Sequence, residues 1–153
     1  MPLELALVVL LLVLCVSGLF MWVRLVAPNK RTIDAPVGEL EQFFWGGVMC
    51  RHLVASGTLA RLEFFDWGVR LRGIPISRWI VPTWEAKYDE LAIAELVALP
   101  QSRIAVWLRV PGEPTAVAFL SDRTSQILPV FEAHGVQVNR SVTRIRRVEE
   151  LYK

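Results

Sequence analysis

With 153 residues the chain has room for one ordinary domain, and its formal net charge of +2 is too small to argue for a nucleic-acid partner. Hydrophobic residues make up 54% of the sequence, and much of this excess lies near the N-terminus. The only cysteines are Cys15 and Cys50, which argues against a disulfide framework. These bounds favour one small domain that follows an unusually apolar segment.

The first predicted element is an apolar helix over residues 5–23, nineteen residues without a charge. Such a helix would be about 28 Å long, close to the hydrocarbon thickness of a bilayer. No basic residue precedes it and no small-residue cleavage site follows it, so a retained anchor is favoured over a removable signal peptide. Because Arg24, Lys30 and Arg31 follow the segment, we expect a single-pass protein of the inner (cytoplasmic) membrane with its C-terminal domain in the cytoplasm.

The region after this segment is rich in proline and polar residues, so residues 28–56 are predicted as a linker, with one or two helical turns at 39–44. The next element is a half-buried antiparallel hairpin over residues 60–73. There, apolar and polar residues alternate on both sides of Asp66-Trp67-Gly68.

Further strands are predicted at residues 91–99, 102–110 and 115–120. A helix follows and ends at Gly135, and the tail over residues 139–153 has apolar residues at helical spacing. Strands closed by one helix near the end predict an α+β, mainly β fold. We expect a small antiparallel barrel or sandwich closed by a C-terminal helix and preceded by one transmembrane helix.

Four stretches carry a resemblance to a known family: "LEFFDWGVRLRG", "VPTWEAKYDELAIAELVAL", "SRIAVWLRV" and "AFLSDRTSQILPVFEAHGVQV". Together they resemble bacterial pleckstrin-homology-like (PH-like) domains. The resemblance covers residues 57–138, and it implies a fold that serves lipid binding, protein binding or assembly. The first loop is only Asp66-Trp67-Gly68, without a basic residue, so no inositol phosphate site is expected there. The resulting domain map is an anchor at 1–27, a linker at 28–56, the PH-like domain at 57–138 and a basic tail at 139–153.

A candidate surface for a protein partner lies on the strand at residues 102–110. Trp107 falls on the same face as Arg103 and Arg109, where the alternation predicts exposure. Tryptophan beside arginine is typical of interface hot spots. Ordinary packing of Trp107 under a loop is the alternative.

The C-terminal tail holds the one concentrated cluster of charge. Basic residues of this kind can contact anionic lipid, although Glu149 and Glu150 partly cancel the charge and a solvated helix is the alternative. The candidate lipid-binding residues are Arg140, Arg144, Arg146 and Arg147.

Candidate catalytic and metal sites are sparse. Cys50 and His52 could form a thiol–imidazole pair, but two ligands do not make a zinc site, and no CxxC or HExxH motif is present. We therefore predict no enzyme, no cofactor and no metal. The predicted function is a membrane-tethered scaffold module in the cytoplasm that docks a protein partner at the bilayer and does not bind nucleic acid. An anionic-lipid sensor that uses the C-terminal arginines is the alternative.

Overall fold

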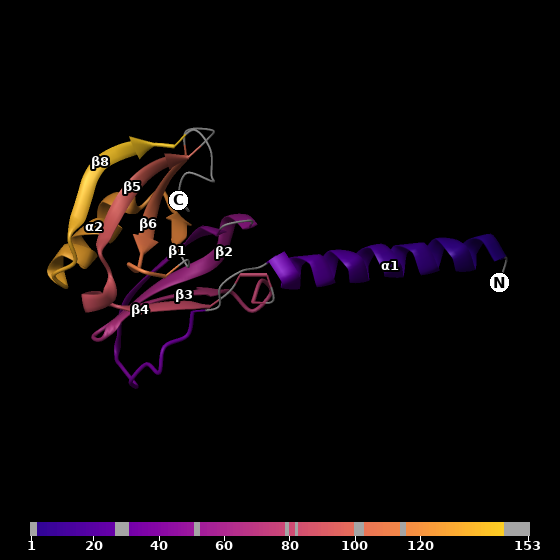
Figure 1. The fold of residues 1–153 in the computed structure, drawn as a ribbon, viewed down its shortest axis with the longest axis horizontal. Helices are drawn as coiled ribbons and strands as arrows, with labels where there is room; N and C mark the ends of the chain where they lie inside the picture. The colour runs from indigo at the N-terminus through magenta and orange to yellow at the C-terminus, as the bar shows by residue number, and fades with distance from the viewer. Residues whose placement is uncertain are drawn as a thin grey trace.

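The computed structural model describes residues 3–26, 31–50, 53–78, 80–81, 83–99, 103–113 and 116–145. Within these ranges a long N-terminal helix precedes a sheet domain that contains a second helix (Figure 1). The elements are α1 (Leu3–Val26), β1 (Leu40–Cys50), β2 (Leu53–Phe65), β3 (Gly68–Gly73), β4 (Trp84–Lys87), the 3-10 helix η1 (Tyr88–Glu90), β5 (Ile93–Leu99), β6 (Arg103–Arg109), β7 (Val117–Leu120), α2 (Thr124–Ala133) and β8 (Val138–Arg144).

The strands form one sheet in the order β4-β3-β2-β1-β7-β6-β5-β8. Neighbours are antiparallel except β5 and β8, which run parallel. Figure 1 shows the sheet bending between its two halves, with α2 beside β5, β6 and β8. The prediction of a mainly β, mostly antiparallel fold with a helix near its C-terminus is confirmed. The expected closed barrel or sandwich is wrong, because the strands form one open sheet whose end strands, β4 and β8, do not pair with each other.

The main core lies between α2 and the inner face of the sheet. Helix α2 buries Ile127, Leu128 and Phe131 on one side, and the Phe131 ring lies 4.9 Å from the ring of Phe64 on β2. The helix ends as predicted, because Gly135 adopts φ +78°, a conformation that favours glycine. The hairpin predicted at residues 60–73 is also present, formed by β2 and β3.

Residues 39–44 do not form the expected helical turns. Residues from Leu40 onward belong to β1, which pairs with β2 on one side and with β7 on the other. Aromatic side chains favour strands, and pairing on both edges outweighs the weak local preference for a helix. Strand β1 is the element that joins the two halves of the sheet.

The start of the tail also differs from its expected helix. Residues Val138–Arg144 form β8, and beyond it the Ile145 N–H donates to the Ala98 carbonyl at 3.0 Å. The helical spacing of the apolar residues is overridden by pairing with β5. The sheet therefore extends past both ends of the predicted range 57–138.

Residues 5–23 are helical, as predicted, within α1, which projects away from the sheet (Figure 1). Among the described residues, no helix is long and apolar enough to cross a membrane. This finding contradicts the predicted anchor and the single-pass membrane localisation.

Candidate functional site

A groove opens where β2 separates from β1. Gly46 pairs with Ala60 but Val48 pairs with Ala55, so residues 56–59 stand opposite the single residue Gly47. On the opposite edge of β1, Gly47 pairs with Leu120 of β7. This irregular register leaves β2 free of β1 over several residues at the junction of the two halves.

The groove has a volume of about 1540 Å³ and is lined by segments from β1, β2, β6, the residues after β3, and the stretch from the end of β7 to the start of α2. Sites for small molecules usually measure about 300–1,000 Å³, so this groove is larger than a small ligand needs. We call it the aromatic groove because its β1 wall is formed by Phe43 and Trp45, with Ile104 of β6 also lining it.

Phe43 and Trp45 are exposed because β1 alternates between two faces. Phe44 points into the core, while Phe43 and Trp45 remain 43% and 46% exposed on the other face. Their rings meet edge to face at 5.9 Å. The Arg61 guanidinium lies over both, 4.9 Å from the Phe43 ring and 5.6 Å from the Trp45 ring. Such cation–π contacts hold the aromatic pair in a defined arrangement.

A buried carboxylate positions Arg61. Glu63 is only 1% exposed, and its Oε1 accepts a hydrogen bond from Arg61 and forms a second ion pair with Arg72 at 2.8 Å. Charge-assisted hydrogen bonds of this kind fix side-chain geometry more firmly than neutral ones. Glu63 therefore holds Arg61, and Arg61 in turn holds the two aromatic rings.

The described rim of the groove is more basic than acidic. Arg103 and Arg123 are exposed there, and Asp122 is the acidic residue among the described lining. Helix α2 begins at this rim with Arg123 as its N-cap and without a side-chain cap. Positive charge and exposed aromatic surface thus occur together in the groove.

The three predicted protein-binding residues do not lie in one site. Arg103 lines the aromatic groove, but Trp107 and Arg109 lie farther along β6 and do not. Trp107 is half-buried and packs against a second apolar cluster on the outer face of the sheet, which includes Met49 and Val97. Its indole Nε1 is buried without a hydrogen-bond partner, and the Arg109 guanidinium lies 5.4 Å from the ring centre. This half-buried position is closer to the alternative of ordinary packing than to the full exposure that the alternation predicts.

The lipid-binding candidates are only partly described. Arg140 is exposed and donates to both carboxylate oxygens of Glu132, at 3.1 and 2.7 Å. This contact lowers the pKa of the Glu132 carboxyl. Arg144 is exposed at the end of β8, and Arg146 and Arg147 lie outside the described residues.

Sequence reasoning missed Phe43, Trp45, Arg61 and Glu63 as site residues. The first two lie in the stretch "QFFWGG", which contains three consecutive aromatic residues and therefore lacks apolar–polar alternation. Arg61 and Glu63 lie at the polar positions of the predicted hairpin. Their pairing with β1, however, depends on a strand that was not predicted. The run of three aromatic residues before Gly46-Gly47 is the one signal that could have indicated a strand there.

Cys50 is 3% exposed, and burial raises the pKa of its thiol to about 12. A buried neutral thiol is a poor nucleophile. His52, the other member of the predicted pair, lies outside the described residues. Within the described ranges, no group of three or more His, Cys, Asp or Glu side chains could hold a metal ion.

The burial of Cys50 predicts slow alkylation. In a Cys15→Ser variant, where Cys50 is the remaining thiol, we expect iodoacetamide at pH 8 to react with the native protein at least about a hundredfold more slowly than in concentrated urea. The Cys50→Ser variant is the control, because Cys15 is exposed and should react without denaturant. Equal rates for Cys50 with and without urea would contradict this expectation and revive the nucleophile hypothesis.

Comparison with known proteins provides no family for this chain. No family model matches it, and no curated protein is similar to it. The predicted resemblance to bacterial PH-like domains is contradicted by this result. The four stretches on which the resemblance was based contain alternating strand residues, turn residues and one amphipathic helix. Many unrelated β-rich folds share these features.

Proposed function

We propose that this chain is a protein-interaction module whose aromatic groove docks an extended segment of a partner protein. The segment would place an apolar or aromatic side chain against Phe43 and Trp45 and acidic side chains beside Arg103 and Arg123. The observation that carries the proposal is the exposed aromatic pair, held in place by Arg61. Preorganised aromatic and arginine side chains supply most of the binding energy at many interfaces.

Three features favour a peptide segment of this chemistry. The volume of the groove, about 1540 Å³, exceeds that of usual small-molecule sites. Exposed large apolar side chains gather there from two separate strands, β1 and β6. The two arginines at the rim complement acidic flanks, which would increase the association rate and fix the orientation of the segment.

The anionic-lipid alternative gains no comparable support. Arg140 is paired with Glu132, and only Arg144 among the other candidates is described. The docking proposal also includes no catalytic step.

The test begins with displayed random heptapeptides panned against the full-length chain. We expect enriched peptides to combine a large apolar residue with adjacent Asp or Glu. With the best synthetic peptide, fluorescence anisotropy should show about thirtyfold weaker binding for Trp45→Ala, and about fivefold for Arg103→Ala or Arg123→Ala. Because these side chains are exposed, thermal unfolding should remain close to that of the wild-type chain.

The matched control is Arg78→Ala, which removes an exposed arginine that does not line the groove. Its affinity should equal that of the wild-type chain. Enrichment of peptides without acidic residues would overturn the proposed partner chemistry. Unchanged affinity in the folded Trp45→Ala variant would overturn the groove as the docking site.

A further inference from the structure

The outer edge of β4 is covered by the residues that follow α1. β4 is the last strand at one end of the sheet order. Arg31 forms a parallel bridge with Trp84, and the Glu85 N–H donates to the Arg31 carbonyl at 2.9 Å. The Ile33 N–H donates to the Glu85 Oε2 at 3.1 Å. A short piece of chain thus occupies the position that another strand would take.

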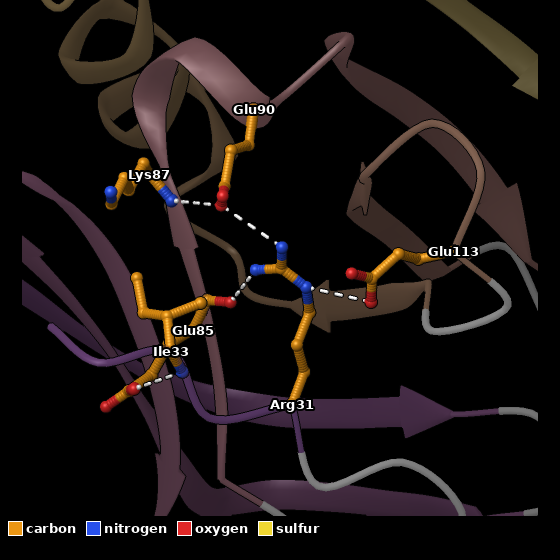
Figure 2. A network of polar contacts seen from close by, with 6 residues as sticks. All are labelled: Arg31, Ile33, Glu85, Lys87, Glu90 and Glu113. Atoms are coloured by element: carbon orange, nitrogen blue, oxygen red, sulfur yellow. Dashed lines mark hydrogen bonds and ion pairs between the residues drawn. The ribbon is translucent and has the colours of Figure 1, made fainter.

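The Arg31 side chain completes the cover (Figure 2). Its guanidinium donates to the Glu85 carbonyl, to Glu90 Oε2 at 3.1 Å and to Glu113 Oε2 at 3.0 Å. Glu90 Oε2 also accepts from the Lys87 N–H at 3.1 Å. Burial opposes ionisation of Glu90, but these two donors hold the pKa of its carboxyl below the ordinary value. We call this set of contacts the Arg31 clasp.

The clasp satisfies three backbone groups that β4 directs away from β3. These are the N–H and carbonyl of Glu85 and the N–H of Lys87, since residues on a strand alternate between its two neighbours. Uncovered groups of this kind are a template for pairing with another chain. The other terminal strand, β8, is a poorer template because its register with β5 shifts between Glu95 and Val97.

We infer that the β4 edge is a pairing surface which the Arg31 clasp covers, and that its partner when the clasp opens is the β4 edge of a second copy of this chain. Antiparallel pairing about Ala86 would place Glu85 of each copy opposite Lys87 of the other. Those two residues carry the outward backbone groups, so each pair would exchange two hydrogen bonds. Their opposite charges would lie on the same face, and the contact would be two-fold symmetric.

The first experiment is sedimentation velocity on the full-length chain over a range of concentrations. Relative to wild type, Arg31→Ala should produce a species of twice the mass whose fraction grows with concentration. Arg78→Ala, which removes an exposed arginine that is not part of the clasp, should sediment like wild type. Circular dichroism and tryptophan emission establish that the variants are folded. An Arg31→Ala chain that is folded and sediments like wild type would overturn the inference.

A second substitution tests whether β4 is the pairing surface. Lys87 has φ −74° and ψ 155°, which proline can adopt, and its N–H points away from β3. Adding Lys87→Pro to Arg31→Ala should therefore return the sedimentation profile to that of wild type. Association that persists in the double variant would place the contact on another surface and overturn the inference.

Two further measurements complete the test. Should Arg31→Ala fail to fold, Arg31→Lys retains the charge, but its single nitrogen cannot replace the three guanidinium nitrogens that reach the three acceptors, so it should show the same association to a smaller extent. Binding of the groove peptide should be the same in Arg31→Ala and wild type, because the clasp and the aromatic groove share no residue. The inference and the proposed function can therefore fail independently.

Discussion

Gly46→Ala should lower the free energy of unfolding by about 3 kcal/mol. A Cβ at this position would lie 2.2 Å from the Leu120 carbonyl oxygen and 2.7 Å from the Phe119 ring. The nearest atom belongs to the backbone of the neighbouring strand β7, so a side-chain movement cannot relieve the clash. The substitution would force apart β1 and β7, the contact through which the two halves of the sheet are joined.

Chemical denaturation followed by tryptophan fluorescence measures this effect on the full-length chain. Gly57→Ala is the control, because an added Cβ there meets nothing within 4 Å but the residue has φ +90°. It should cost only about 1 kcal/mol, the strain of an alanine in the left-handed region. Equal losses for the two variants would show that the approach of β1 to β7 is not the constraint at Gly46.

The same glycine shows why one strand was not predictable. In isolation, Gly46-Gly47 indicates the end of a helical turn, whereas in the sheet Gly46 provides the close approach to β7. By contrast, residues 60–73 have a period of two and a turn that joins sequence neighbours, so local pattern was sufficient there. The hairpin formed by β6 and β7 was predictable for the same reason.

The other features that could not be predicted depend on contacts between residues far apart in sequence. Arg31 was counted only as a basic residue after an apolar segment, yet its partners Glu90 and Glu113 lie 59 and 82 residues away. Nothing within the linker signals those contacts. Similarly, Arg103 could be proposed from its strand alone, but the groove that it lines requires residues from five segments.

The groove also depends on Glu63, and Glu63→Ala should lower the free energy of unfolding by about 2–3 kcal/mol. Arg61 and Arg72 are paired directly across β2 and β3, so their charges repel without the carboxylate between them. Breaking a buried ion pair costs about 3–5 kcal/mol, and we reduce this because the arginine side chains are 21% and 37% exposed and can regain water.

The control for Glu63→Ala is Glu132→Ala, which removes a carboxylate from the exposed ion pair with Arg140. Its denaturation midpoint should match that of wild type. Equal midpoints for the two variants would contradict a special role for the buried carboxylate.

Glu63→Gln separates stability from binding. It preserves the size of the side chain but removes the charge that holds Arg61, so the chain should remain folded while Phe43 and Trp45 lose their fixed partner. We expect the groove peptide to bind this variant about tenfold more weakly, although Glu63 is buried and would not contact the peptide. Unchanged affinity would mean that the aromatic pair keeps its arrangement without Arg61, and binding would then depend on the exposed side chains alone.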